Sequence, residues 1–290
     1  MTATDVRQYP VGCGGTTTRV LESGAGGIPV VFLHGVGARA DRWTPALRRF
    51  AERGRHCYAF DFPGHGLAGK PETFDYTVPG YAAFTEALLD ALGLTEVILV
   101  GTSLGGHVAG AVTVRRPPPV RALVLVGPMG MLPAAQPVLD ALAASIQDTT
   151  RAGIAAKLAR LLVNQQLISD EWVDEEFRIN NSPGAAAAFA ALARYFATGI
   201  NDDVVAGPLR AAAATVPTLL VWGAKDVMVP TEMAEPARRA LGDVPLTLMP
   251  DTGHAPYFEA AGEFVAQVDG FLADHALPAT VAATAGGLAR

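Results

Sequence analysis

The chain has 290 residues, of which 50% are hydrophobic and 17% are charged, and this composition is typical of a compact globule and not of a disordered chain. Its formal net charge is -6 and the lysines and arginines are scattered, so no basic patch indicates binding to nucleic acid or to an anionic membrane surface. The N-terminus lacks an apolar signal segment and no apolar run approaches the length of a membrane span, which together predict a cytoplasmic protein.

Strand-like apolar segments alternate with helical stretches along most of the chain. This alternation predicts an α/β fold with a mostly parallel sheet, right-handed crossovers and helices on both faces. In such a sheet the carboxyl ends of the parallel strands meet at one edge, where functional groups are usually placed. The predicted strands are residues 16–22, 28–33, 55–61, 96–101, 120–126, 217–223 and 244–249.

Residues 129–210 contain no convincing strand. Segments 141–144, 154–162 and 185–197 instead predict helices whose apolar faces are wider than a surface helix needs. A lid over the edge of the sheet explains this excess, because it needs one face for the core and another for a substrate; a helical subdomain without a substrate role is the alternative.

This interpretation divides the chain into four parts. Residues 1–128 and 211–276 form the two halves of the core domain, and residues 129–210 form the lid. Residues 277–290, rich in Ala, Thr and Gly, are predicted to be a disordered tail.

The most informative motif is a Gly-x-Ser-x-Gly frame centred on Ser103, directly after the apolar run 97–100. A strand that turns abruptly into a helix strains the residue at the turn, and the small neighbours Gly101 and Gly105 permit this conformation. The N–H of Leu104, at the start of the helix, would point to a developing negative oxygen. Ser103 is therefore predicted to be a nucleophile, although ordinary strand–helix turns and phosphate-binding loops also place glycines around a serine.

A serine nucleophile needs a general base that is oriented by an acid. His254 follows the strand-like segment 244–249 and Asp226 follows segment 217–223, so both lie at the predicted functional edge. We predict that His254 is the base and Asp226 the acid, with Asp251 as a rival orienter. Taken singly, a loop histidine is more often a solvated residue and an aspartate after a strand is often a helix N-cap.

A tetrahedral intermediate needs a second hydrogen-bond donor besides Leu104. The strand-like segment 30–33 ends in a glycine-rich loop, and we assign this donor to the N–H of Val36; the flanking glycines alternatively serve only to turn the chain. Met129 and Met228 are predicted to contact substrate in an apolar pocket, and both are equally compatible with the core.

Together these residues resemble the α/β-hydrolase fold family over about residues 16–275. Segment 61–66 resembles that family's Asp-x-Pro-Gly-x-Gly turn, whose role is architectural, and His254 with Pro256 and Glu259 resembles its histidine loop. The resemblance implies an eight-stranded, mostly parallel sheet with an inserted helical lid. Serine at position 103 implies the serine-nucleophile branch, because haloalkane dehalogenases and epoxide hydrolases have aspartate there.

The lid is similar to that of meta-cleavage-product hydrolases, which cleave C–C bonds in vinylogous diketones. Segments 167–171 and 182–184 carry this similarity. The chain departs from that group at three positions: Thr102 where asparagine is common, Glu176 where a lid arginine grips the substrate carboxylate, and Ala255 where tryptophan follows the histidine. The resemblance therefore implies related architecture and leaves the C–C reaction as an alternative.

The expected activity is cofactor-independent hydrolysis of a carboxylic ester or lactone, with an apolar small-molecule carbonyl compound as substrate. Cys13 and Cys57 have neither metal-ligand nor redox spacing, and no metal is expected. The same residues could instead catalyse C–C hydrolysis of a diketone, acyl transfer, or lyase or oxygenase chemistry that uses only the base. A further alternative is a binding protein that has kept the triad without using it. An apolar lid exterior could equally be the interface of a homo-oligomer.

Overall fold

The computed structural model describes residues 5–115, 120–277 and 279. They form an eight-stranded sheet with the strand order β1-β2-β4-β3-β5-β6-β7-β8, and the prediction of an α/β fold is confirmed. All neighbouring pairs from β4 to β8 are parallel. The strands are β1 Arg7–Cys13, β2 Thr16–Ser23, β3 Val30–Leu33, β4 Cys57–Phe60, β5 Val97–Thr102, β6 Val120–Val126, β7 Thr218–Gly223 and β8 Leu246–Met249.

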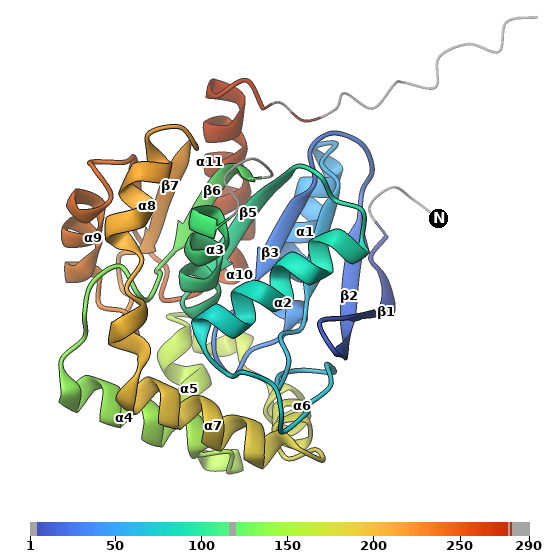
Figure 1. Ribbon diagram of the computed structural model, residues 1–290, viewed down its shortest axis with the longest axis vertical. Coiled ribbons are helices and arrows are strands. Elements are labelled where there is room, and N and C mark those ends of the chain that lie inside the picture. The colour runs from blue at the N-terminus through green and yellow to red at the C-terminus, as the bar shows by residue number, and fades with distance from the viewer. Residues whose placement is uncertain (1–4, 116–119, 278, 280–290) are drawn as a thin grey trace, which may run out of the picture.

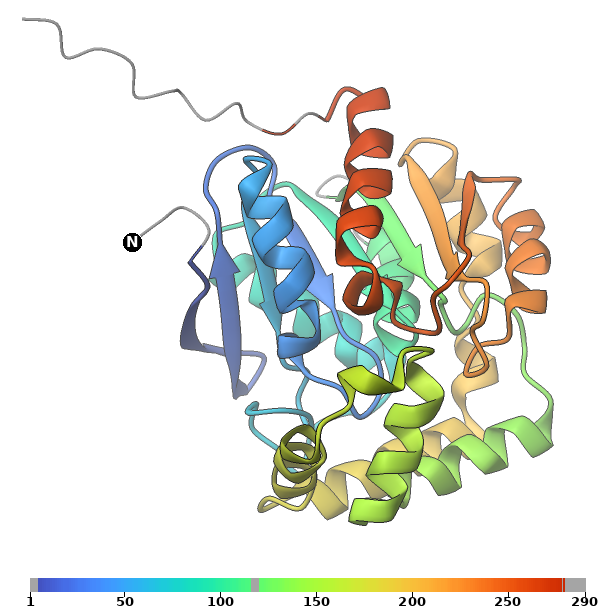
Figure 2. The same ribbon diagram turned by 180° about the vertical axis from the view of Figure 1, so that it is seen from behind.

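Helices cover both faces of this sheet (Figures 1 and 2). Helices α1 and α11 pack together on one face, around Trp43, Phe50 and Phe264, and α2, α3, α8 and α9 cover the other face. The helices are α1 Thr44–Glu52, α2 Val78–Ala91, α3 Leu104–Arg115, α4 Gln136–Gln147, α5 Arg151–Leu161, α6 Asp170–Asn180, α7 Ala185–Thr198, α8 Ala206–Ala213, α9 Ala234–Ala240, α10 Pro256–Glu259 and α11 Ala261–Asp274; the short 3₁₀ helices are η1 Ala40–Trp43, η2 Gln165–Leu167, η3 Ile200–Asp203 and η4 Thr231–Met233.

The edge strand β1 was not located by the sequence analysis. It pairs antiparallel with β2 through a two-residue turn in which Gly14 and Gly15 have φ values of 55° and 77°. A Gly-Gly pair between two strand-like runs is a hairpin signal, because this turn needs positive φ at both positions. The signal was present in the sequence, but Pro10 and Gly12 weaken the strand pattern before it.

Helices α4 to α7 lie beyond the carboxyl ends of the central strands (Figure 1). Helix α4 packs against α7, and α5 packs against α6. Helix α6 was not predicted; its N-cap is Ser169, whose hydroxyl accepts a hydrogen bond from the Trp172 N–H at 3.2 Å. The division into core and lid at residues 128 and 210 stays a prediction.

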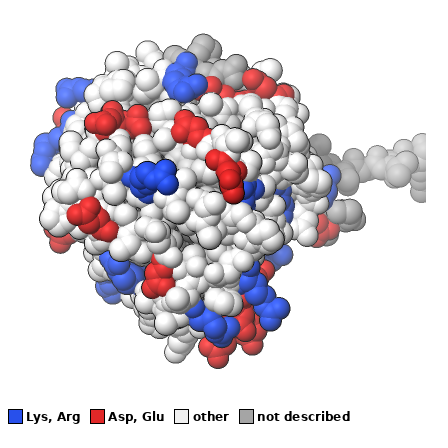
Figure 3. Space-filling model, turned by 60° about the horizontal axis from the view of Figure 1, so that its bottom comes forward, with Lys and Arg blue, Asp and Glu red and all other residues white. Residues whose placement is uncertain are grey.

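The surface over these helices carries basic and acidic side chains that are interspersed (Figure 3).

No helix of the described part is both long and apolar enough to cross a membrane. At the C-terminus, Leu277 is buried and its carbonyl accepts a hydrogen bond from Arg55 Nη1 at 2.7 Å, so the prediction of a disordered tail that begins at residue 277 is wrong for this residue. Residue 278 and residues 280–290 of that prediction lie outside the described residues.

The carboxylate of Asp61 joins its own loop to η1 and to β2. Its side chain is fully buried and accepts hydrogen bonds from the N–H groups of Ala40, at 2.7 Å, and Leu67, at 2.9 Å. It also pairs with Arg19 Nε at 3.0 Å. A buried carboxylate with all these partners is stable only while the partners remain in place.

We expect Asp61→Ala to lower the free energy of unfolding by about 3–5 kcal/mol, because it leaves Arg19 and two buried N–H groups without their partner. Asp41, which also pairs with Arg19 but whose side chain is 38% exposed, supplies a control: Asp41→Ala should lower it by about 1 kcal/mol or less. Urea unfolding curves of both variants would measure the difference. Equal losses would contradict the anchoring role of Asp61.

Candidate active site

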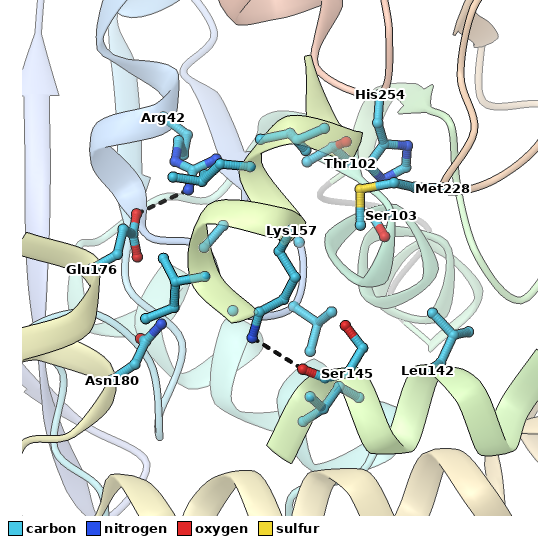
Figure 4. Close-up of a pocket in the computed structure, with 18 of the residues that line it drawn as sticks. Arg42, Thr102, Ser103, Leu142, Ser145, Lys157, Glu176, Asn180, Met228 and His254 are labelled. Carbon is cyan, nitrogen blue, oxygen red and sulfur yellow. Dashed lines mark hydrogen bonds and ion pairs between the residues drawn. The ribbon is translucent and has the colours of Figure 1, made fainter. Parts of the chain in front are cut away.

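Ser103 lies in a strained turn between β5 and α3. Its φ is +54°, a conformation that is uncommon for any residue other than glycine. Its backbone is held on both sides: the N–H donates to Val126 O, and the carbonyl accepts from the N–H of Met129, both at 3.1 Å. The turn that the sequence predicted at this position is therefore present, and it directs Ser103 toward a cavity (Figure 4).

The structure brings Asp226 and His254 together from the loops after β7 and β8. Asp226 Oδ2 lies 2.6 Å from His254 Nδ1, and both side chains are buried. The other carboxylate oxygen accepts hydrogen bonds from the N–H groups of Met228 and Val229. A carboxylate only accepts hydrogen bonds, so Nδ1 carries the proton and Nε2 is left as the basic nitrogen. The rival Asp251 is exposed and pairs with Lys225 at 2.9 Å.

Ser103 and His254 line the same cavity (Figure 4). No hydrogen bond joins their side chains within the described part of the chain. In sites of this kind, the bond between nucleophile and base is often long or poorly aligned until the substrate binds. The arrangement places a serine hydroxyl and an imidazole on one cavity, and a buried carboxylate is bonded to the far side of the imidazole.

Glu259 holds the histidine loop, a role that the sequence analysis did not assign to it beyond the family motif. Its Oε2 accepts a hydrogen bond from the Gly253 N–H at 2.6 Å. Its Oε1 accepts from the N–H groups of Val163, at 2.6 Å, and Asn164, at 3.0 Å. One carboxylate thus joins the loop of His254 to the segment that follows α5.

The two proposed oxyanion donors lie on either side of Ser103. Leu104 is the first residue of α3, where helix N–H groups have no intrahelical acceptor, and Val36 lines the cavity in the loop after β3. Neither N–H donates to another described residue. Both groups are therefore available to a developing oxyanion.

His34 fixes the loop that carries Val36. The ring is completely buried: Nδ1 donates to Gly35 O at 2.8 Å, and Nε2 accepts from the N–H of Phe62 at 2.9 Å. Burial lowers the pKa of His34 to about 4, and burial together with the neighbouring His34 lowers the pKa of His65 to about 3. Both rings are therefore neutral near pH 7.

The cavity in front of Ser103 has a volume of about 90 Å³ and extends beneath the helices of residues 136–198 (Figure 4). Of the two methionines predicted to contact substrate, Met228 lines the cavity, whereas Met129 is not among its lining residues and packs against the core. Much of the remaining lining is apolar and comes from Leu142, Ile146, Ile154, Leu158, Leu161, Phe189 and Tyr257.

One wall of the cavity carries an ion pair that the sequence analysis did not predict. Arg42 Nη2 lies 2.9 Å from Glu176 Oε1, and both side chains are buried. The indole N–H of Trp172 donates to the same oxygen at 3.1 Å, and the Arg42 guanidinium lies 4.3 Å from the centre of the indole ring. The charge of Glu176, at the position where the resemblance places a lid arginine, is thus neutralised from the core side.

No group of three or more His, Cys, Asp or Glu side chains within residues 5–115 and 120–277 is arranged to hold a metal ion.

The sequence profile of the alpha/beta hydrolase fold matches residues 28–261. The chain belongs to the alpha/beta hydrolase fold family, and it is an enzyme of that family. It is 28% identical over 267 residues to a 2-hydroxy-6-oxo-2,4-heptadienoate hydrolase of Pseudomonas putida, covering 90% of this chain and 94% of the relative.

It is also 29% identical over 250 residues to the dihydrolipoyllysine-residue acetyltransferase component of an acetoin cleaving system of Cupriavidus necator, covering 86% of this chain. The match spans 65% of that relative's length. A solved structure of a serine hydrolase involved in carbazole degradation, the CarC enzyme, is similar with a TM-score of 0.79 and 25% identity over 93% of this chain and 99% of that one.

If Asp226 orients His254, Asp226→Asn should lower turnover of p-nitrophenyl acetate by about 10³–10⁴-fold, because the amide no longer fixes the proton on Nδ1. Asp251→Asn, a change of the same chemistry on the exposed rival, should leave turnover within about twofold. Steady-state rates of the two purified variants would measure this. A larger loss of turnover in the Asp251 variant would show that Asp251, and not Asp226, orients His254.

The neutral state of His34 makes stability depend on pH. The unfolded histidine binds its proton near its usual pKa of about 6.5, whereas the folded one does so near 4. The contribution is fully present above pH 6.5 and declines as the pH falls toward 4, by up to about 1.4 kcal/mol per pH unit for each such histidine. Urea unfolding at neutral and mildly acidic pH should show this decline. His34→Gln should reduce the dependence of the unfolding free energy on pH, and His275→Gln, a change at an exposed histidine, should leave it unchanged. An unchanged pH dependence in the His34 variant would refute the role of His34.

Proposed function

We propose that the protein is a serine hydrolase that cleaves a carboxylic ester or lactone through an acyl-enzyme, without a cofactor. The observation that carries this proposal is the strained Ser103, which shares a cavity with a histidine whose Nδ1 is bonded to a buried carboxylate. Its specific substrate is a small carbonyl compound with an apolar part, because much of the cavity lining is apolar.

In the proposed reaction, His254 Nε2 takes the proton of Ser103 as Oγ bonds to the substrate carbonyl carbon. The N–H groups of Val36 and Leu104 stabilise the oxyanion. The intermediate then expels the alcohol, which receives its proton from His254. Water activated by His254 attacks the acyl-enzyme and releases the acid and free Ser103.

In this proposal the segment 129–210 acts as a lid. Two contacts support the role: the N–H of His254 donates to the carbonyl of Leu161, at the end of α5, at 2.9 Å, and Glu259 binds the residues that follow. The same segment supplies most of the apolar cavity wall. The lid would therefore exclude water from the site and define the shape of the substrate.

Hydrolysis of a C–C bond in a vinylogous diketone is the second candidate. It is favoured by the similarity to the heptadienoate hydrolase, which extends over 94% of that protein. Against it stand Thr102, Glu176 and Ala255, which differ from the pattern of the meta-cleavage-product hydrolases. Loss of the colour of a ring-fission product on mixing with the enzyme would favour this candidate over ester hydrolysis.

We expect a fluorophosphonate probe to add to the wild-type protein with a stoichiometry of about one, because an oriented base makes a serine nucleophilic. Ser103→Ala should give no adduct, and intact mass measures both. A folded wild-type protein that forms no adduct, or an adduct that persists in Ser103→Ala, would refute the proposed nucleophile. If the unlabelled wild-type protein transfers the acetyl group of p-nitrophenyl acetate to an added thiol faster than to water, acyl transfer would replace hydrolysis as the proposed reaction.

A further inference from the structure

His107 is a buried histidine that the proposed reaction does not use. It lies on α3, one turn after Ser103, and its exposed fraction is 0%. It is not among the residues that line the cavity. Burying a polar ring is unfavourable unless the ring is hydrogen-bonded, so the contacts of His107 indicate what it does.

Two stretches connect the helices α4 to α7 to the rest of the chain. They are residues 128–131, before α4, and residues 203–205, after α7, and we call them the stem. The N–H of Val205 donates to the carbonyl of Gly130 at 3.0 Å, so the two stretches are bonded to each other. Helix α8, which follows the stem, packs against α3 (Figure 1).

The ring of His107 is hydrogen-bonded to the second stretch of the stem. Its Nε2 lies 2.7 Å from the backbone carbonyl of Asp203. A carbonyl only accepts hydrogen bonds, and burial lowers the pKa of the ring, so the neutral ring carries its proton on Nε2 and donates to this carbonyl. Nδ1 has no hydrogen-bond partner in the described part of the chain. The side chain therefore makes a single hydrogen bond, and that bond goes to the stem.

The same ring lies directly against the first stretch of the stem. A Cβ on Gly130 would lie 2.3 Å from three atoms of the His107 ring, and the φ of Gly130 is +72°, so only glycine fits at this position. One residue earlier on α3, a Cβ on Gly106 would lie 2.9 Å from Cβ of Pro128. The stem and the first turn of α3 are thus in close contact.

The stem is also bonded to the turn of the proposed nucleophile. The N–H of Met129 donates to the carbonyl of Ser103 at 3.1 Å, and the backbone N–H of His107 donates to the same carbonyl at the same distance. The strained φ of Ser103 therefore depends partly on a hydrogen bond that comes from the stem. A stem that moved away from α3 would break this bond and let the turn relax, which would displace Oγ.

We propose that His107 is a positioning residue for the reaction of Ser103. Its hydrogen bond to Asp203 and its contact with Gly130 hold the stem against α3. The stem in turn holds the carbonyl of Ser103 through Met129. A space-filling role would account for the contact with Gly130 but not for the hydrogen bond to Asp203. This inference rests on the proposed function, because it assumes that Ser103 is the nucleophile.

The rate at which a fluorophosphonate modifies Ser103 tests this role, with the limiting rate and the half-saturating concentration measured separately. We expect His107→Leu to lower the limiting rate by about 10–100-fold, because a small displacement of reacting atoms has an effect of this size. His107→Gln keeps a donor the same number of bonds from the backbone as Nε2, and its limiting rate should stay within about threefold of the wild-type rate. The half-saturating concentration should change by less than about threefold in both variants, because His107 does not line the cavity.

A variant elsewhere on α3 separates positioning from a general loss of stability. Val112 is as deeply buried as His107 but lies beside residues of α2. Val112→Ala should lower the midpoint of urea unfolding and leave the limiting rate within about threefold of the wild-type rate. A loss of rate in Val112→Ala as large as in His107→Leu, or a His107→Gln protein as slow as His107→Leu, would overturn the positioning role.

If His107→Leu does not fold, a change on the stem provides the same test. Gly130→Ala adds a methyl group where the ring of His107 lies, and it should lower the limiting rate by about tenfold or more. Gly93→Ala is the matched control, because Gly93 has a similar φ of +68° and no atom within 4 Å of its added Cβ. A wild-type rate in a folded Gly130→Ala protein would contradict the proposal.

Hydrogen exchange measured by NMR separates failure of this inference from failure of the proposed function. In His107→Leu the amides of Met129 and Val205 should exchange about tenfold or more faster than in the wild type, because the stem is no longer held. Faster exchange in a protein whose wild type forms no adduct would keep the hold on the stem and reject the nucleophile. An adduct that forms on Ser103 at the wild-type rate in His107→Leu would keep the hydrolase and reject the positioning role.

Discussion

Three backbone segments approach one another around Ser103 so closely that side chains cannot stand between them. A Cβ on Gly105 would lie 2.3 Å from Leu33 O, and a Cβ on Gly101 would lie 2.2 Å from Gly105 O. Real Cβ atoms do not tolerate such distances, so β3, β5 and α3 can meet in this way only through glycine. The close contact fixes the N-terminus of α3 and the loop after β3 against each other. Ser103 and both proposed oxyanion donors take their relative positions from this contact.

The loop of His254 is held by a different part of the molecule, which connects it to α5. The backbone of His254 donates to Leu161 at the end of α5, and Glu259 binds both the histidine loop and the residues that follow α5. A displacement of α5 would therefore shift the loop of His254 as well as the cavity wall. Helix α5 also lines the cavity through Ile154, Leu158 and Leu161, so a ligand that moved this helix would also move the loop of His254.

Sequence patterns predicted the residues whose positions depend on local geometry or on strand ends. Ser103 was found from its glycine frame, and Asp226 and His254 were found because parallel strands bring their carboxyl ends to one edge. Strand β1 was missed because Pro10 and Gly12 weaken its pattern, although the Gly14–Gly15 turn signalled a hairpin.

The cavity wall could not be predicted in this way. Arg42, Lys157 and Asn180 come from separate elements, and their positions around the cavity depend on how α5 and α6 pack on the rest of the chain. Helical periodicity shows which face of a helix is apolar, but it does not show where that helix docks. Lys157 and Asn180 also resemble ordinary polar surface residues in their local sequence. Met228 lies in the loop directly after Asp226, at the end of a strand, and it lines the cavity. Met129 was also predicted to lie there, but it is not in the cavity lining.

The buried pair of Arg42 and Glu176 joins two parts of the chain across one wall of the cavity. Arg42 belongs to η1, which precedes α1, and Glu176 belongs to α6. Glu176 is held by the ion pair and by the indole hydrogen bond of Trp172. Because both charges are buried, removal of either one would leave the other without a partner in a place that water does not reach. The position of α6 beside the cavity therefore depends on this pair.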